Sequence, residues 1–372
     1  MMRARSNNFY QVAETDYATS PGETLQDLME EQGLTQRDLA RRADLSPKHV
    51  NQLLHGMVSL SPAIAQRLEL VTGMPARMWN QMEALYQSDL QRIQARRNLA
   101  ECSTWLDAMP VMSLLKRGVL PESPDDRASR VQQMLSFFGV ASVSAWDSVY
   151  ANLECAFRQS IAHEIKPGAV AAWLRLGEIA ARKVKCSPFD PKGLRSVLPE
   201  LRTLTSDPSE VFAPKVQAIC AAHGVAVVFV EEIEGARASG VMRWLTPDKA
   251  LIQLSFRYRT DDHLWFTFFH EVGHVLLHGK TNLWIEDSHS SESDPKEAEA
   301  DRFSRDLLIP PAAAASLRDL RSKSSVIDFA RRVGVAPGIV VGRLQHDIMW
   351  QPKNGNDLKR RIDLAHTDLS TG

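Results

Sequence analysis

The sequence lacks a strong net charge, closely spaced cysteines, a signal segment and a membrane-spanning apolar run. Its net charge is only −1 over 372 residues, so any DNA binding must rest on a local basic patch. The four cysteines are widely spaced, with no CxxC pair and no zinc-ribbon spacing, and we expect them to stay reduced. The N-terminus has no apolar signal segment, and no apolar run approaches membrane-spanning length. These absences predict a cytoplasmic protein without a membrane partner.

One short motif, His270-Glu-Val-Gly-His274, carries the clearest chemical signal. On a helix the two histidines lie one turn apart, so both imidazoles can reach one metal ion. Glu271 is rotated away from both, where a base acting on a water molecule at the metal should lie. The motif predicts a catalytic zinc site with Glu271 as the base. Two buried histidines without a metal, or a structural zinc, are the alternatives.

A third zinc ligand is expected on a second helix, with Asp294 as its cap and Pro295 at its first position. Glu297 and Asp301 share one face of this helix at spacing i, i+4. We predict that Glu297 is the third ligand and that Asp301 accepts a hydrogen bond from a ligand imidazole. Glu299, on another face, is the rival third ligand.

The two helices have recognisable ends and buried faces. Thr260 is expected to cap the first helix and Gly279 to end it. On the second helix, Ala300, Phe303 and Leu307 are expected to form the inward stripe. His278 continues the histidine stripe but lies too far along the axis from His270 to share its metal, and we interpret it as a polar residue closing the helix end.

Three strands are predicted before the first helix, over residues 225–230, 240–245 and 250–256. A sheet packed on that helix suits a protease, because an edge strand can hold an extended peptide beside the metal. Residues 280–293 are expected to form a mobile loop near the site. His289 or Tyr258 could stabilise the oxyanion, although no spacing supports either residue.

These residues resemble a known family. His270-Glu-Val-Gly-His-Val-Leu-Leu-His278, followed by Glu297-x-x-Ala-Asp-x-Phe-x-x-x-Leu-Leu-x-Pro310, is similar to the ImmA/IrrE family of zinc metallopeptidases. The resemblance implies a compact zincin-like domain in which the two motif histidines and a glutamate hold zinc and the motif glutamate acts as base. It also implies a substrate of the helix-turn-helix repressor type. Ser304 departs from the alanine usual after the phenylalanine, without a consequence that we expect for the metal.

Near the N-terminus the pattern changes to short, closely spaced helices. Thr35 and Ser46 are expected to cap two consecutive helices, and Gly56 to end the second. Polar side chains near the start of the second helix suit reading of the DNA major groove, where Asn and Gln can bond adenine and Lys can bond guanine or phosphate. A plain helical hairpin with a solvated face is the alternative. The predicted DNA contacts are Gln36, Ser46, Lys48, Asn51 and Gln52.

This region resembles the HigA branch of the Xre-type helix-turn-helix family, over about residues 20–86. The motifs that carry the resemblance are Pro21-Gly-Glu-x-Leu, Gly33-Leu-Thr-Gln-x-x-Leu-Ala40 and Leu45-Ser-x-x-x-Val-Asn-Gln-Leu-Leu-x-Gly56. The resemblance implies binding of double-stranded operator DNA as a homodimer and, in HigA proteins, neutralisation of a cognate toxin. The motifs favour DNA binding more strongly than they favour antitoxin activity.

Together these observations predict a mainly α-helical chain with a small β-sheet. We expect a flexible arm (1–19), an all-α helix-turn-helix domain (20–90), a helical connector (91–205), an α+β zincin-like metallopeptidase domain (206–350) and a polar tail (351–372). The predicted function is a DNA-binding regulator carrying a Zn²⁺-dependent endopeptidase that cuts a partner repressor or its own linker. The alternative is a HigA-like repressor or antitoxin whose metal domain is not catalytic and binds a toxin or senses a signal.

Overall fold

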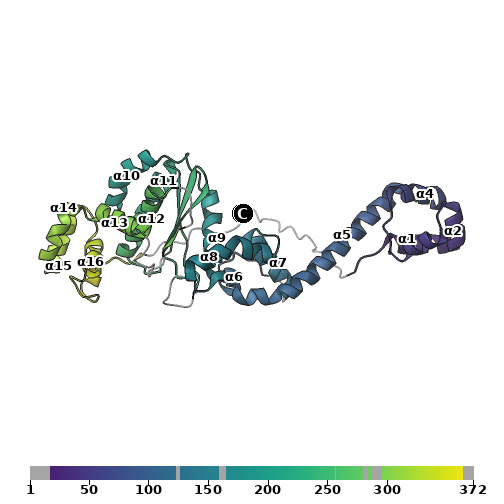
Figure 1. Cartoon of the computed structure of the whole chain (residues 1–372), viewed down its shortest axis with the longest axis horizontal. Helices are drawn as coiled ribbons and strands as arrows, with labels where there is room; N and C mark the ends of the chain where they lie inside the picture. Colours follow the sequence, from purple (N-terminus) through teal and green to yellow (C-terminus); the bar gives the residue numbers. More distant parts are fainter. Residues whose placement is uncertain are drawn as a thin grey trace, which may run out of the picture. The chain divides into compact units, whose positions relative to one another are not determined.

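The computed structural model describes residues 17–122, 126–158, 165–255, 257–279, 284–286 and 295–362. Most of the predicted arm, Asp294, most of the predicted loop over 280–293 and the tail from residue 363 lie outside the described residues. The chain divides into two compact units, residues 1–103 with 127–129 and residues 104–126 with 130–372. The first unit is helical where described, and the second contains the sheet (Figure 1).

The first unit begins with five helices that follow one another with short connections. They are α1 (Pro21–Glu31), α2 (Gln36–Arg42), α3 (Pro47–Leu54), α4 (Pro62–Thr72) and α5 (Ala76–Glu101). Their core is built from aliphatic side chains around the buried Trp79 of α5, including Leu25, Leu39 and Val50. α5 runs past residue 91, where the connector was predicted to begin, as a continuous helix.

Local capping fixes the starts of α2 and α3 as the sequence predicted. The Thr35 hydroxyl accepts a hydrogen bond from the Asp38 backbone N–H at 3.2 Å, and the Thr35 N–H donates to the Asp38 carboxylate at 3.4 Å. The Ser46 hydroxyl accepts from the His49 N–H at 3.1 Å, and Pro47 occupies the first helical position. Each cap satisfies backbone donors that a helix start leaves unpaired.

The second unit contains a four-stranded sheet surrounded by helices. Before the sheet come η1 (Cys102–Ala108), α6 (Val111–Lys116), α7 (Arg127–Phe138), α8 (Val143–Arg158), α9 (Pro167–Lys183), α10 (Pro191–Thr203), η2 (Leu204–Ser206) and α11 (Ser209–Ala222). The strands are β1 (Val225–Phe229), β2 (Gly240–Thr246), β3 (Lys249–Leu254) and β4 (Trp284–Glu286). The other helices are α12 (Asp261–Leu277), α13 (Pro295–Leu308), α14 (Pro311–Ala314), η3 (Ala315–Asp319), α15 (Lys323–Val333), α16 (Pro337–His346) and η4 (Asn356–Leu358).

The strand order is β1-β3-β2-β4, with β1 parallel to β3 and the other pairs antiparallel. The three predicted strands are confirmed as β1, β2 and β3. β4 was not predicted: it lies inside the segment expected to be a mobile loop, and its pairing with β2 joins Gly240 to Glu286 and Met242 to Trp284. A three-residue strand is too short to show recognisable alternation, and its pairing with β2, about forty residues earlier in the chain, is not visible in the local sequence.

Both faces of the sheet are covered (Figure 1). One face, which includes Val227 and Ile252, joins the core that contains α12. On the opposite face the amide of Gln253 donates to the Trp173 carbonyl of α9 at 2.7 Å, and the Trp173 indole N–H donates to the Val230 carbonyl at 3.0 Å. α9 lies within the stretch predicted as a connector, and here it is the layer that covers the second face of the sheet.

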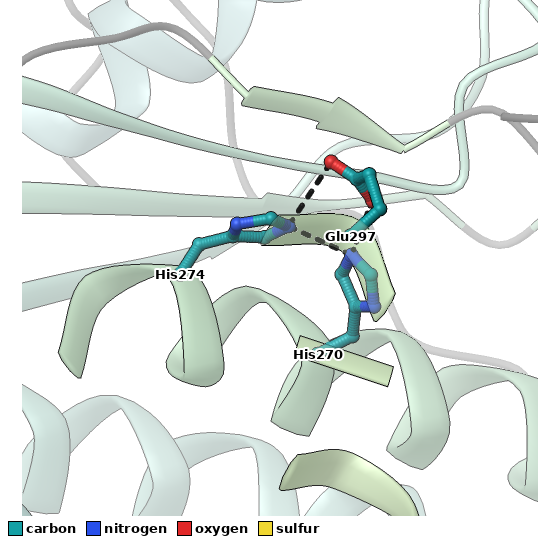
Figure 2. A group of neighbouring side chains, drawn as sticks. All are labelled: His270, His274 and Glu297. Atoms are coloured by element: carbon teal, nitrogen blue, oxygen red, sulfur yellow. Dashed lines mark hydrogen bonds and ion pairs between the residues drawn. The ribbon is translucent and has the colours of Figure 1, made fainter. Parts of the chain in front are cut away.

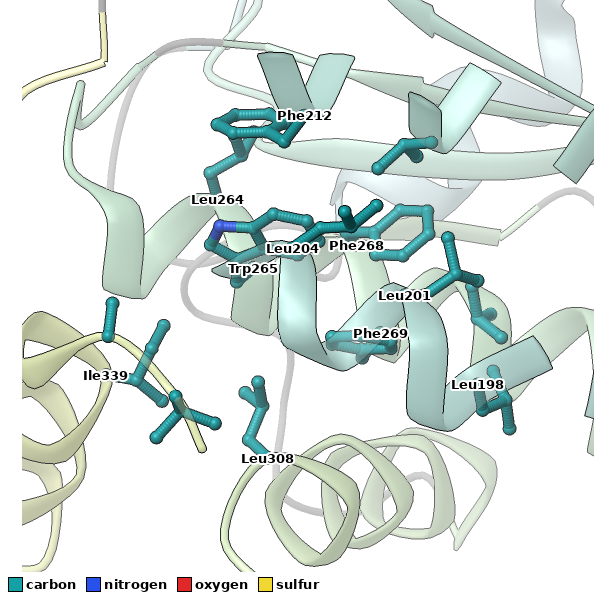
Figure 3. Packing of buried hydrophobic residues seen from close by; sticks show 14 of the residues in the cluster. Leu198, Leu201, Leu204, Phe212, Leu264, Trp265, Phe268, Phe269, Leu308 and Ile339 are labelled. Carbon is teal, nitrogen blue, oxygen red and sulfur yellow. The ribbon is translucent and has the colours of Figure 1, made fainter. Parts of the chain in front are cut away.

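α12 is buried along almost its whole length. Trp265, Phe268 and Phe269 lie in the largest core cluster, with leucines of α10 and Phe212 of α11 packed around them (Figure 3). No helix in the described part of the chain is both long and apolar enough to cross a membrane. The helix ends at the predicted place, with His278 as C-cap and Gly279 in the left-handed conformation at φ +73°.

The start of α12 is held by distant residues. Thr260 is the N-cap residue, as predicted, but its side chain makes no cap hydrogen bond. Instead the Asp261 N–H donates to the Arg360 carbonyl at 3.0 Å, Thr260 pairs with Arg361 in an antiparallel bridge, and Lys359 forms an ion pair with Asp262 at 2.6 Å. Residues 359–362 therefore form a strap over the first turn of α12, within the segment 351–372 that was predicted as a polar tail.

α12 and α13 cross closely at Gly273. A Cβ atom built on Gly273 would lie 3.2 Å from the Ala300 Cα and 3.2 Å from the Phe303 Cδ1. The Ser304 hydroxyl, fully buried, donates to the Phe266 carbonyl of α12 at 2.8 Å. The predicted inward stripe is partly corrected: Ala300 is buried, whereas Phe303 and Leu307 are only partly buried, because the stripe turns toward Ser304 and Leu308.

Candidate functional site

The side chains of His270, His274 and Glu297 meet at one point between α12 and α13 (Figure 2). The Nε2 atoms of the two histidines lie 2.9 Å apart. The Glu297 carboxylate lies 3.1 Å from His270 Nε2 and 3.4 Å from His274 Nε2. Among the described residues, these three are the group whose donor atoms could hold a metal ion.

Asp301, Glu299 and His278 lie around this group and contact its histidines or one another. Asp301 Oδ1 lies 2.8 Å from His270 Nδ1, the nitrogen on the far side of the ring from the group. Glu299, the rival third ligand, lies 3.1 Å from His278 Nε2 instead, and His278 Nδ1 lies 2.9 Å from His274 Nδ1. The structure thus brings Glu297 to the two histidines and places Glu299 with His278.

The donor set fits a tetrahedral zinc ion. Bonds of about 2.0–2.1 Å at tetrahedral angles separate two ligand atoms by about 3.3 Å, close to the distances within the group. Because a carboxylate only accepts, His270 Nδ1 carries the proton shared with Asp301, and the lone pair of its Nε2 points into the group. Two imidazole nitrogens and one carboxylate leave a fourth position open, which is the arrangement of catalytic zinc.

The protonation states of this group also suit a metal. Burial lowers the pKa of His274, which favours the neutral imidazole that binds metals. Burial alone would raise the pKa of Glu297, but without a metal the hydrogen bonds that the Nε2 atoms of His270 and His274 form with it outweigh burial and lower that pKa to about 2. A metal ion would take the place of the proton on these Nε2 atoms. The carboxylate is therefore ionised, as a ligand must be.

Glu271 lies beside the group, fully buried, where α12 meets the start of β2. A Cβ atom built on Gly240 would lie 2.9 Å from Glu271 Oε1 and 2.4 Å from the Thr267 methyl, so a side chain at position 240 would displace the carboxylate. Gly240 also pairs with Glu286 of β4, the outermost strand. The edge of the sheet is thus adjacent to the predicted base. Nothing in the sequence pointed to Gly240, since its role depends on a contact with a residue 31 positions away.

The two residues considered for the oxyanion gain no support. The Tyr258 ring stacks on His263, with ring centroids 4.3 Å apart, and the guanidinium carbon of Arg257 lies 5.3 Å from the centroid of the Tyr258 ring. His289 lies outside the described residues.

The predicted DNA-contacting residues gather around the starts of α2 and α3. Gln36 and Lys48 are exposed, and Asn51 and Gln52 are half-buried on α3. The hydroxyl of Ser46 is used as the cap of α3, so that residue contributes to the position of the helix. Val50, Leu53 and Leu54 form the opposite, buried side of α3.

Comparisons with known proteins agree with both parts of this description. Residues 25–79 match the helix-turn-helix family, and residues 222–345 match the IrrE N-terminal-like domain of peptidase family M78. The chain is 32% identical over 59 residues to an uncharacterized HTH-type transcriptional regulator, YddM, of Escherichia coli (strain K12). That match covers 16% of this chain and 63% of the relative. The chain therefore joins a helix-turn-helix DNA-binding domain to a metallopeptidase-like domain.

Proposed function

We propose that this chain is a DNA-binding transcription regulator whose C-terminal domain is a zinc-dependent endopeptidase acting on a regulatory protein. The observation that carries the proposal is the convergence of two imidazole nitrogens and an ionised carboxylate beside the buried Glu271. Burying that many polar groups without a compensating ion is costly, and a divalent cation would offset the cost. Histidine, histidine and glutamate are also the ligand set of many catalytic zinc sites.

Each side chain has a part in the proposed hydrolysis. His270, His274 and Glu297 would hold zinc, which when bound supplies Lewis-acid activation of the scissile carbonyl and of a water molecule. A Glu271 carboxylate oxygen takes the proton from that water as it attacks, and then delivers the proton to the departing amine. The hydrocarbon surroundings of α12 keep bulk water away from this transfer.

The sheet suggests how the substrate is held. β4 is the last strand in the order, and its register places Glu286 opposite Gly240, next to Glu271. A peptide in extended conformation could add to this edge through main-chain hydrogen bonds, with its scissile bond near the zinc ligands. The peptide must be extended. A cut within residues 76–101 of this chain would first require unwinding of α5, whereas an extended segment of a partner repressor or of the later part of the connector could bind directly.

The first unit would supply DNA binding. We infer that α3 enters the major groove, with Asn51 and Gln52 on base edges and Lys48 on a base or phosphate, and that Gln36 at the start of α2 contacts phosphate. The exposure of Lys48 and Gln36 and the buried opposite side of α3 support this orientation. Binding of the operator as a homodimer stays a prediction from the resemblance.

The test is the substitution Glu271→Gln, which keeps the size of the side chain and removes its proton-accepting charge. The wild type and the variant would be produced in host cells, and newly formed protein N-termini would be compared by mass spectrometry. We expect cut sites present with the wild type and absent with Glu271→Gln. Glu200→Gln, at an exposed carboxylate of α10 outside the zinc group, is the matched control and should retain the cuts.

Zinc content decides between the two predicted functions. We expect about one zinc per chain in the wild type and in Glu271→Gln, and much less in His270→Ala and Glu297→Ala. Identical cut sites with the wild type and Glu271→Gln would contradict the peptidase. If zinc is bound but neither protein cuts, and operator binding is intact in both, the repressor or antitoxin with a non-catalytic metal domain would be favoured.

A further inference from the structure

We infer that His278 and Glu299 form a hydrogen-bonded chain that positions His274 as a zinc ligand, which makes them positioning residues of the metal site. The inference rests on the zinc site proposed above, and it gives both residues a role different from the one predicted from the sequence. His278 had been interpreted as a polar helix end, and Glu299 as the rival third ligand.

The chain of hydrogen bonds runs through both rings. Glu299 Oε2 lies 3.1 Å from His278 Nε2, and His278 Nδ1 lies 2.9 Å from His274 Nδ1. The His278 side chain is only 3% exposed although it stands at the end of α12, whereas the Glu299 side chain is 60% exposed. The two rings are tilted by 57° with centroids 5.0 Å apart, so they meet through their nitrogen atoms and are not stacked.

These contacts determine which nitrogen of each ring carries the proton. An ionised carboxylate only accepts hydrogen bonds, so the His278 Nε2 must donate to Glu299. With zinc on His274 Nε2, the proton of this ring is on Nδ1, so His274 Nδ1–H donates to His278 Nδ1. The Nε2 lone pair of His274 then serves the metal at the point where His270 Nε2 and Glu297 also meet. One carboxylate thus sets the tautomer of a ligand two rings away.

The two ligand histidines are therefore supported differently. His270 donates directly to Asp301, whereas His274 donates to the ring of His278, which is itself held by Glu299. Partners behind a ligand imidazole fix its orientation and tautomer, and their loss typically weakens metal binding about 10- to 100-fold. Since Glu299 acts through His278 and is exposed to water, we expect its removal to have the smaller effect.

The test measures zinc affinity and coordination on the full-length protein. The zinc dissociation constant would be determined by competition with a chromogenic chelator, and Co²⁺ would be substituted for zinc to record the visible absorption of its coordination sphere. The variants are His278→Ala, His278→Asn and Glu299→Ala. Asn places its Oδ1 where His278 has Nδ1, so it can still accept from His274, whereas Ala cannot. Leu277→Ala, at the exposed neighbouring residue, is the matched control.

We expect His278→Ala to weaken zinc binding about 10- to 100-fold and to alter the Co²⁺ spectrum, and His278→Asn and Leu277→Ala to remain close to the wild type. Wild-type affinity in His278→Ala would overturn the inference. An equal loss in His278→Asn would also overturn it, because the ring would then act through packing alone. A wild type that binds no zinc would overturn both this inference and the proposed peptidase. Tight zinc binding without any protein cleavage would contradict the peptidase alone.

Discussion

Helices α3 and α12 carry the side chains proposed to bind DNA and zinc, but different parts of the chain hold the two helices in place. α3 is fixed by its own neighbours in sequence, through the Ser46 cap and Pro47. α12 is fixed from a distance: its first turn is bonded to the strap of residues 359–362, and its centre crosses α13 at Gly273. The cap residue Thr260 adds no side-chain hydrogen bond there.

The difference follows from what each helix must do. A helix that contacts DNA through one exposed face needs only a stable helical conformation and a buried face packed on its own domain. α12 must also bring two imidazoles to a carboxylate on another helix, so its position relative to α13 must be correct within a fraction of an ångström. Contacts distant in sequence supply that precision, and three measurements would break or sharpen the comparison.

The largest expected effect lies at the strap. Burial and the neighbouring Asp262 raise the pKa of Asp261 from 3.8 to about 6, against the opposing effect of Arg360. The folded chain therefore binds this proton more readily than the unfolded chain, so the contribution of Asp261 to stability is full below about pH 4 and is lost as the pH rises through 6. The loss amounts to about 3 kcal/mol of unfolding free energy.

Asp261→Asn should remove that pH dependence. Urea unfolding of the second unit at pH 4.5 and 7.5, with a chelator present, would give the change in free energy for the wild type and the variant. Asp328→Asn, at an exposed carboxylate on α15, is the control and should keep the wild-type profile. The same fall in stability in the wild type and Asp261→Asn would show that another group is responsible.

The next effect is expected at the helix crossing. Gly273→Val would push methyl groups against Ala300 and Phe303, which we expect to cost about 1–3 kcal/mol and to move Glu297 away from the histidines, weakening zinc binding. Gly273→Ala adds a single methyl and gains about 1 kcal/mol in helix propensity, so its stability should stay near the wild type. Wild-type zinc affinity in Gly273→Val would mean that the crossing does not position Glu297.

The smallest effects compare the two caps directly. Ser46→Ala should lower the unfolding free energy of the first unit by about 1 kcal/mol, because it removes the acceptor for the His49 N–H. Thr260→Ala should change that of the second unit by less than about 0.5 kcal/mol, since its hydroxyl caps nothing. Thermal unfolding of both variants would check the pair. Equal losses would remove the contrast between a helix held locally and one held from afar.

The same contrast explains what the sequence could predict. Spacing alone placed His270 and His274 on one face and favoured Glu297 over Glu299, because one-turn periodicity within a helix is a local property. The capping of α2 and α3 was equally local. The roles of these residues in metal and DNA binding stay predictions, but their placement needed no tertiary information.

What was missed depends on contacts between distant segments. β4 forms by pairing with β2, and the role of Gly240 depends on its close approach to Glu271. The strap looks like an exposed polar segment in the sequence, but its charged residues pair with buried aspartates of α12. The contact between His278 and Glu299 could be predicted only in part. The sequence shows that His278 lies one helical turn after His274 and that Glu299 lies two residues before Asp301. It does not show that His278 and Glu299 meet between the two helices.

The strap has a consequence for the order of events during synthesis of the chain. Domains generally fold as units while the ribosome is still working, with the N-terminal one first. The DNA-binding unit is complete when Ser103 and residues 127–129 have been made, whereas α12 waits for Lys359 and Arg360, almost a hundred residues after its own first turn. A chain released before those residues would carry a complete helix-turn-helix unit and an α12 without its anchor. Under the proposed function, early termination would therefore yield a DNA-binding protein without peptidase activity.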